Sequence, residues 1–322
     1  MPLFLDEQCV SGLVTMQDAL EVVEEAFREQ GASNVINVPR VRAPLRDGVL
    51  RITAAVLSYR GLYGVKVSST AVFGRNSGRM FSLYREDSGE LCAVVQVFAM
   101  GTLRTGAASG VATKHLANES ASILGVIGTG RQARTQIDAI RQVRPIREVR
   151  VYSRNPDHRQ RFCADVGSTS GIKATAVDEP EQAVRGCHIV VTATTATAPV
   201  LMGRWVEPGT HINAIGANYE FRRELDSAAV TGANFICTDD CEQVRYESMD
   251  LATPVQEGAL RWERVCALSD VVCGRVRGRS ASTDITLFKS LGVALEDVAL
   301  AARAYEKARE RGIGQVLPDL SG

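Results

Sequence analysis

Apolar and polar residues alternate with two different periods along this chain, and the change of period separates its parts. Near the N-terminus, Thr15 and Asp18 have the spacing of a helical capping box, and apolar residues then recur on one face as far as Gly31. This pattern predicts an amphipathic surface helix. Between about residues 37 and 97, short apolar runs are broken by Arg-Asp-Gly, Asn-Ser-Gly and Asp-Ser-Gly turns, which predicts an antiparallel or mixed sheet.

The middle of the chain changes to a regular alternation of strands and helices. A helical stretch from about Thr102 to Leu116 is followed, between residues 122 and 240, by six apolar runs separated by helix-like segments: SILGVIG, REVRVYS, IKATAV, HIVVTAT, HINAIG and NFICTD. Such β-then-α alternation is typical of a parallel, doubly wound sheet. A last helix, beginning near Val293, has an apolar face and basic residues near its end, and we expect it to pack back onto the first part of the chain.

These elements predict an α/β protein, in which a Rossmann domain with a doubly wound parallel sheet is joined to a smaller α+β domain. The length of 322 residues agrees with two domains, because single hydrophobic cores seldom grow beyond roughly 250–300 residues. We place the Rossmann domain at residues 118–292. The smaller domain is expected to combine residues 1–117 with residues 293–322.

Charge and composition narrow the choice of partner. The 37 basic and 37 acidic side chains cancel, so we expect a small-molecule ligand rather than nucleic acid or a membrane surface. No stretch approaches the roughly 18 uninterrupted apolar residues of a membrane span, and the N-terminus does not resemble a signal peptide, which favours a cytoplasmic protein. Eight scattered cysteines suggest free thiols, and Cys237 and Cys241 have no neighbouring pair to complete a zinc site, so no metal is expected.

The segment ILGVIGTGRQA places a phosphate-binding turn between a buried strand and a helix. In Gly128-x-Gly130-x-x-Ala133, the first glycine permits a tight turn, the second lets the backbone approach a pyrophosphate, and the alanine allows close helix packing. The helix N-terminus then faces the phosphate charge. A glycine turn in some other α/β fold is the alternative. The cofactor-binding residues predicted in this turn are Gly128, Thr129, Gly130, Arg131, Gln132 and Ala133.

The end of the second predicted strand indicates which dinucleotide binds. An NAD enzyme usually has an Asp or Glu there for the ribose hydroxyls, whereas this chain has Ser153, Arg154 and Asn155. Since Arg154 can bind a 2′-phosphate, NADP(H) is favoured and NAD(H) is the alternative, which would hold if Arg154 pointed into solvent. Thr192 and Thr194, after the run HIVV, are expected along the cofactor's path or as hydroxyls that fill a strand end.

Five motifs, spread over nearly the whole chain, resemble those of one known family. They are GVKV around Lys66, LRTGAASGVATKHLA from Leu103, LGVIGTGRQA, RRELD ending at Asp226 and ITLFKSLGVALED from Ile285. On these motifs the chain resembles the ornithine cyclodeaminase and mu-crystallin family. The resemblance implies a homodimer, in which the smaller domain serves substrate binding and dimerisation and faces the cofactor cleft across the substrate.

The resemblance also implies that Arg40, Lys66 and Arg104 hold a substrate carboxylate. These residue types suit the task, since a guanidinium binds a carboxylate through two parallel hydrogen bonds and a lysine in a closed cleft can exchange protons. A surface ion pair is the ordinary alternative for either arginine. Lys66 is more informative, because a lysine inside the apolar strand GLYGVKV is costly to bury without a partner.

Asn218 departs from the cyclodeaminase pattern, in which the resemblance places a catalytic Asp just after the strand HINAIGA. Because asparagine cannot act as a general acid or base, we expect it to orient a water, an imine or the nicotinamide by hydrogen bonds. This suits hydride transfer better than cyclisation of ornithine. Arg222, four residues on, matches a basic position of the family and either contacts a ligand or lies in solvent.

Arg51 is a second departure. An ungapped match from Arg40 places it where ornithine cyclodeaminase has a Glu that holds the distal amino group of ornithine. The reversed charge should repel a cationic substrate side chain and tolerate an acidic or neutral one, unless Arg51 faces outward from its strand. Arg79 falls in a loop where family members place residues that contact the substrate.

We therefore expect an NAD(P)H-dependent oxidoreductase that transfers hydride to the C=N carbon of a small 2-imino carboxylate, with Arg40, Lys66, Arg104 and Asn218 at the reacting centre. The reverse reaction is dehydrogenation of an amino acid. One alternative is a cyclodeaminase that releases ammonia from ornithine or lysine with recycled NAD. Another is an NADPH-dependent binding protein for a small ligand, in the manner of mu-crystallin. Turnover separates these, because a binding protein does not consume its cofactor.

Overall fold

The computed structural model describes residues 1–71 and 80–318, so Arg79 lies outside the described residues. The chain divides into two compact units: unit 1 comprises Met1–Thr105 with Gly292–Gly322, and unit 2 comprises Gly106–Leu291. This division falls inside helix α3 (Phe98–Leu116), whereas the boundary expected from sequence lies just after the same helix. In the described part of the chain, no helix is long and apolar enough to cross a membrane.

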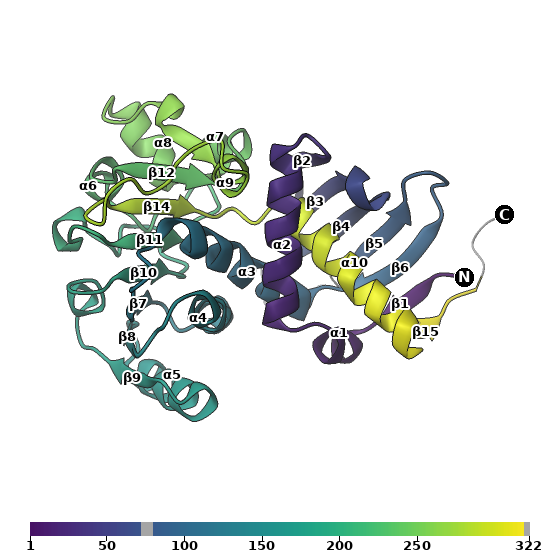
Figure 1. Ribbon diagram of the computed structural model, residues 1–322, viewed down its shortest axis with the longest axis horizontal. Coiled ribbons are helices and arrows are strands. Elements are labelled where there is room, and N and C mark those ends of the chain that lie inside the picture. The colour runs from purple at the N-terminus through teal and green to yellow at the C-terminus, as the bar shows by residue number, and fades with distance from the viewer. Residues whose placement is uncertain (72–79, 319–322) are drawn as a thin grey trace. The chain divides into compact units, whose positions relative to one another are not determined.

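Unit 1 is built on a seven-stranded mixed sheet (Figure 1). Its order is β15-β1-β6-β5-β4-β3-β2; β1 pairs with β6 in parallel and the other pairs are antiparallel, which confirms the mixed sheet predicted for the first part of the chain. The strands are β1 (Leu3–Leu5), β2 (Val35–Leu45), β3 (Gly48–Leu57), β4 (Leu62–Ala71), β5 (Met80–Arg85), β6 (Leu91–Gln96) and β15 (Gln315–Val316).

Unit 1 also contains α1 (Glu7–Leu13), α2 (Met16–Gly31), the first part of α3 and α10 (Ala294–Arg311). The predicted capping box of α2 is confirmed, because the Asp18 N–H donates to the Thr15 hydroxyl while the Thr15 N–H donates to the Asp18 carboxylate. Helix α10 runs beside α2 and across β3 and β4 (Figure 1), which confirms that the last helix packs onto the first part of the chain.

The two faces of this sheet differ in exposure. On the face under α10, Ala55 and Phe81 are buried. On the other face the side chains are also apolar, yet Ile36, Val38 and Val67 are 61%, 40% and 47% exposed. A strand whose two faces are both apolar is expected to be covered on both.

Unit 2 contains an eight-stranded sheet in which all pairs are parallel, in the order β13-β12-β14-β11-β10-β7-β8-β9. The six strands predicted from sequence are confirmed as β7 (Ile123–Ile127), β8 (Glu148–Tyr152), β9 (Lys173–Ala176), β10 (Ile189–Thr192), β11 (His211–Ala214) and β12 (Phe235–Thr238). Two further strands were not predicted: β13 (Val265–Ala267) and β14 (Thr286–Lys289). Strand β13 has only three residues, and β14 ends in a lysine.

Helices cover the parallel sheet and bury its alternating side chains in two cores. One core joins residues such as Val126 and Val149 to α4 (Arg131–Val143) and α5 (Pro156–Ser170). The other contains Val190 and Ile212. The remaining helices of unit 2 are α6 (Ser227–Thr231), α7 (Gln243–Glu247), α8 (Met249–Gln256) and α9 (Leu268–Val272). The predicted doubly wound α/β fold is confirmed.

Helix α3 begins four residues earlier than the sequence predicts. The carboxylate of Glu7, in α1, accepts hydrogen bonds from the N–H groups of Phe98 and Ala99. A side chain from another helix therefore satisfies the first donors of α3, a role that a neighbouring residue usually fills.

Candidate active site

The turn after β7 has the form of a phosphate-binding loop. Gly128 has φ +115°, and a Cβ at this position would lie 2.4 Å from the Ala193 carbonyl oxygen, so a larger residue does not fit. Gly130 is the N-cap of α4 and contributes no side chain to the cap, while no described atom lies within 4 Å of a Cβ placed on it. The lack of a side chain at Gly130 leaves room at the N-terminus of α4, which fits a dinucleotide pyrophosphate.

The order of the strands on either side of β7 indicates where the two halves of a dinucleotide would bind. From β7 the strand order continues to β8 and β9 on one side and to β10 and β11 on the other. Ligands of such sheets bind at the carboxyl ends of the strands where the order reverses, with the pyrophosphate at the first helix. In folds of this kind, the adenosine half of a dinucleotide lies on the side of the second strand, here β8, and the nicotinamide half on the side of the fourth, here β10.

The residues after β8 form a short, fixed loop. Asn155 caps α5 by accepting a hydrogen bond from the His158 N–H at 3.0 Å, and the Ser153 hydroxyl donates to the Asn155 carbonyl oxygen. The buried Arg159 donates to the Ser153 carbonyl oxygen at 3.0 Å. Arg154 itself is exposed, and none of the three residues 153–155 is acidic.

The predicted cofactor residues after β10 differ in their surroundings. Thr192 is completely buried, and its hydroxyl donates to the Glu224 carboxylate at 3.0 Å. Thr194 is half-buried, its N–H donates to Glu224 at 2.6 Å, and its hydroxyl accepts from the Ala196 N–H. Thr192 is therefore buried at the end of β10, while Thr194 lies nearer the surface.

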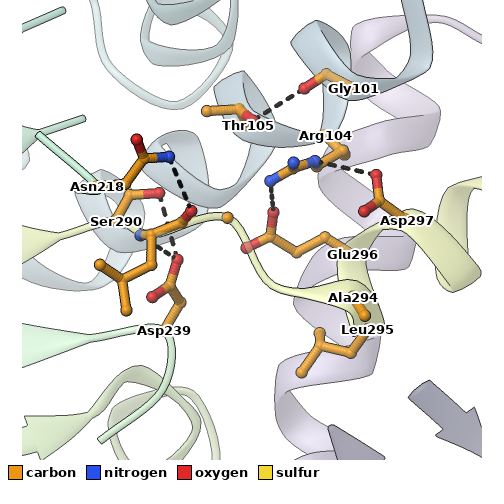
Figure 2. A network of polar contacts seen from close by, with 12 residues as sticks. Gly101, Arg104, Thr105, Asn218, Asp239, Ser290, Ala294, Leu295, Glu296 and Asp297 are labelled. Atoms are coloured by element: carbon orange, nitrogen blue, oxygen red, sulfur yellow. Dashed lines mark hydrogen bonds and ion pairs between the residues drawn. The ribbon is translucent and has the colours of Figure 1, made fainter. Parts of the chain in front are cut away.

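Two further predicted residues follow β11 in unit 2. Asn218 is half-buried, and its amide nitrogen donates to the Leu291 carbonyl oxygen at 3.4 Å (Figure 2). The guanidinium of Arg222 lies over the ring of Tyr219 at 5.1 Å.

In unit 1, the three predicted carboxylate ligands come from three different elements to the start of α10. Arg104 of α3 donates through Nη1 to Glu296 at 2.7 Å and through Nε to Asp297 at 3.2 Å (Figure 2). Lys66 of β4 donates to the other oxygen of Asp297, and Arg40 of β2 donates to the carbonyl oxygen of Gly292. The structure thus brings these three cations together.

Burial changes the acid-base properties of this cation cluster. The side chain of Lys66 is 15% exposed, and burial lowers its pKa to about 8, with the charges of Arg104 and Arg40 acting in the same direction and Asp297 opposing them. Although burial alone would raise the pKa of Asp297, the neighbouring Arg104 and Lys66 hold it below its ordinary value. Asp297 therefore stays ionised, and Lys66 can release a proton near neutral pH.

The register of the sheet places two more polar residues beside Lys66. Thr53 of β3 lies directly opposite Lys66 and is buried, and its hydroxyl has no hydrogen-bond partner among the described residues. Arg51, two residues along β3, is on the same face, opposite Ser68 of β4 and Arg42 of β2. Arg51 therefore lies on the face of the sheet that carries Lys66.

The sequence analysis did not identify the acidic residues beside the cation cluster in unit 1 or at the end of β10 in unit 2. Glu296 and Asp297 follow the apolar run LGVAL, and in a first helical turn acids are ordinarily attributed to the helix dipole. Glu224 lies within the RRELD motif but was given no role. Complete burial is the property that marks these residues, because the exposed fractions of Glu224, Glu296 and Asp297 are all 0%.

Comparison with known proteins agrees with this geometry. The chain is 34% identical to a Thermococcus litoralis Δ1-pyrroline-2-carboxylate reductase solved with NADH and L-proline (98% and 100% of the two chains; TM-score 0.94). It is 34% identical to an archaeal alanine dehydrogenase dimer with bound NAD (98% and 99%; 0.93) and 28% identical to the iminosuccinate reductase of Paracoccus denitrificans with NAD+ (99% and 99%; 0.93). The model of the ornithine cyclodeaminase/mu-crystallin family matches residues 2–312, and the chain belongs to this family.

Proposed function

We propose that this chain is an NAD(P)H-dependent oxidoreductase that reduces the C=N bond of a small 2-imino carboxylate to the amine. The observation that carries the proposal is the meeting of Arg40, Lys66 and Arg104 at the start of α10 in unit 1, together with a dinucleotide turn in unit 2. Bound NAD(P)H supplies the hydride for the imine carbon. The reverse direction dehydrogenates an amino acid.

The charges at the start of α10 support an anionic substrate. Arg104 pairs with Glu296 and Asp297, Lys66 pairs with Asp297, and Arg40 donates to the Gly292 carbonyl oxygen beside them. The acids fix the orientation of Arg104 and Lys66. A substrate carboxylate is proposed to bind the guanidinium groups through charge-assisted hydrogen bonds.

Lys66 is proposed to hold the proton that the reduction consumes. Its pKa of about 8 allows Nζ to carry a transferable proton at neutral pH, which general acid catalysis requires. Asp297 keeps the ammonium group in place through its hydrogen bond. Asn218, which cannot ionise, orients the reacting groups by hydrogen bonds. The Thr53 hydroxyl, buried opposite Lys66, is proposed to bind a polar atom of the substrate.

The cofactor is proposed to be NADP(H), with NAD(H) as the alternative. The turn from Gly128 to Ala133 fits a pyrophosphate, and the exposed Arg154 suits a 2′-phosphate where no acidic residue opposes it. The solved relatives hold NADH or NAD+, so the two cofactors need to be compared directly.

The substrate side chain is proposed to be neutral or acidic. Arg51 and Arg42 face each other across β3 and β2 on the face that carries Lys66, where a cationic side chain would be repelled. This favours simple 2-imino acids over ornithine or lysine.

A homodimer is proposed through the outer face of the sheet in unit 1. Ile36, Val38 and Val67 expose apolar side chains there, which a second copy of the chain would cover. The archaeal alanine dehydrogenase that resembles this chain is a dimer. Replacing Val38 and Val67 by lysine should shift the protein from dimer to monomer in sedimentation, whereas an unchanged sedimentation coefficient would contradict this interface.

The test of function is oxidation of NADPH and NADH by the purified protein with Δ1-pyrroline-2-carboxylate, Δ1-piperideine-2-carboxylate, and pyruvate or glyoxylate with ammonia or methylamine. Turnover with an imine, lost in the variants Arg104→Met and Lys66→Met, supports the proposal. Tight binding of NADPH with no turnover would favour a binding protein. Ammonia release from ornithine, without net cofactor oxidation, would favour a cyclodeaminase.

A further inference from the structure

A chain of buried polar side chains around Glu224 lies beneath the carboxyl ends of β10 and β11 in unit 2. The Glu224 carboxylate accepts a hydrogen bond from the Thr192 hydroxyl at 3.0 Å and from the Thr194 N–H at 2.6 Å. It also accepts one from the Gly216 N–H at 2.7 Å. Because Thr192 and Thr194 are at the end of β10 and Gly216 follows β11, one side chain joins the ends of two neighbouring strands.

Glu224 is itself held in place by a second carboxylate. Asp250, in α8, accepts hydrogen bonds from the backbone N–H groups of Glu224 and Leu225 at 2.7 Å and 2.9 Å. Its other oxygen pairs at 2.9 Å with Lys289, in β14, and both side chains are 0% exposed. A single charge buried this deeply is costly, so Asp250 and Lys289 stabilise each other as an ion pair. The paired Asp250 in turn fixes the backbone at Glu224 and Leu225.

The strand ends above Glu224 are packed too tightly to shift independently. A Cβ on Gly216 would lie 2.2 Å from the Thr194 carbonyl oxygen. A Cβ on Gly128, in the phosphate-binding turn, would lie 2.4 Å from the Ala193 carbonyl oxygen. A displacement of residues 193 and 194 would therefore disturb either Gly216 or the turn that receives the pyrophosphate.

We propose that Glu224 is a positioning residue for the nicotinamide half of the cofactor, which holds the ends of β10 and β11 in the shape that receives this half. The inference rests on the proposed cofactor site at the carboxyl ends of these strands. Glu224 is fully buried and acts through the backbone of Thr194 and Gly216. The adenosine half, on the β8 side of the turn, does not depend on it.

Glutamine cannot replace Glu224 without loss. The Thr194 N–H and the Gly216 N–H donate to different oxygens of the carboxylate. An amide offers only one acceptor oxygen, so its NH2 group would face one of these N–H donors. Burial and the charge of Asp250 raise the pKa of the Glu224 carboxyl, while the charge of Lys289 and the hydrogen bonds from Thr194 act in the opposite direction.

The experiment compares binding of the whole cofactor with binding of its adenosine half. Dissociation constants of NADPH, NADH and two fragments without the pyrophosphate, AMP and adenosine 2′-monophosphate, are measured by calorimetry for the wild-type protein and for Glu224→Gln. Thr192→Val, which removes one donor to Glu224 and keeps the side-chain shape, serves as the milder variant if Glu224→Gln does not fold. Val265→Ala, which removes buried methyl groups from β13 at one edge of the sheet, controls for loss of stability.

The expected result is selective. Glu224→Gln should weaken binding of the preferred dinucleotide by about 10-fold or more and lower kcat, while binding of the adenosine fragment changes by less than about twofold. Thr192→Val should shift dinucleotide binding in the same direction by about two- to fivefold, again without affecting the fragment. Val265→Ala should leave both dissociation constants unchanged at a temperature where it is folded.

Two results would overturn the inference. Equal losses for dinucleotide and fragment would show a general structural role, and an unchanged dinucleotide dissociation constant and kcat in both variants would show no role in positioning. Either would leave the proposed function intact, because the wild-type protein would still bind and oxidise NAD(P)H. A wild-type protein that binds neither NADPH nor NADH would overturn the cofactor site and this inference together.

Discussion

Replacing Gly292 by alanine is expected to damage substrate binding by displacing Arg104. Gly292 has φ +74°, and a Cβ there would lie 2.3 Å from Nη1 and 3.0 Å from Nη2 of Arg104. Ordinary contacts between heavy atoms are about 3.5–4.0 Å, so the guanidinium must retreat by roughly 1 Å or more. Arg104 is 8% exposed and bound to Glu296 and Asp297, so it cannot move without weakening those hydrogen bonds.

The chain offers a matched control for this substitution. Gly274 has φ +76°, and no described atom lies within 4 Å of a Cβ placed on it. Both substitutions should cost about 1–2 kcal/mol of unfolding free energy, because an alanine is strained at positive φ. Only Gly292→Ala should weaken binding of the substrate. Loss of a charge-assisted hydrogen bond, about 1.5–3 kcal/mol, predicts a rise in KM for the imine of about 10- to 100-fold.

The assay is steady-state oxidation of the cofactor with the best imine substrate, together with thermal unfolding of both variants. The dissociation constant of NADPH should be the same in Gly292→Ala, Gly274→Ala and the wild-type protein, since neither glycine belongs to the phosphate-binding turn. If the KM of Gly292→Ala lay within twofold of that of Gly274→Ala, the assignment of Arg104 as a carboxylate ligand would be refuted.

Three further predictions concern single side chains. The pKa of Lys66 is lowered to about 8, so protonated Lys66 is lost as the pH rises through that value, and kcat/KM for imine reduction should fall about tenfold per pH unit above it. Lys66→Arg should lower kcat, because a guanidinium does not release its proton, and the activity that remains should not show this fall in a pH–rate profile. Thr53→Val should raise the KM for the imine about 10-fold. The free energy of unfolding should stay equal or increase by about 1 kcal/mol, because the buried hydroxyl has no described partner. An unchanged KM would show that Thr53 does not contact the substrate. Arg154→Ser should raise the KM for NADPH by about 10-fold or more and leave that for NADH within twofold, and equal changes for both cofactors would contradict a 2′-phosphate contact.

The sequence by itself determined those features that depend on residues close together in the chain. The capping box at Thr15 and Asp18 specifies the start of α2, and the spacing of glycines at 128 and 130 specifies a turn between a strand and a helix. Alternation of short apolar runs with helical segments was sufficient for the parallel sheet, because buried strands and amphipathic helices each leave a local periodicity. Strands β13 and β14 lie beyond residues 122–240, where this alternation was found.

The tertiary structure alone decided which polar residues meet. Arg104 binds Glu296 and Asp297 from more than 190 positions away in the chain, and Glu7 caps α3 across 91 positions. Lys289 appears in sequence as a charge at the end of an apolar run, yet the surrounding sheet buries it completely against Asp250. The energies of such contacts depend on burial and geometry after the chain has folded, and no local pattern of residue types encodes them.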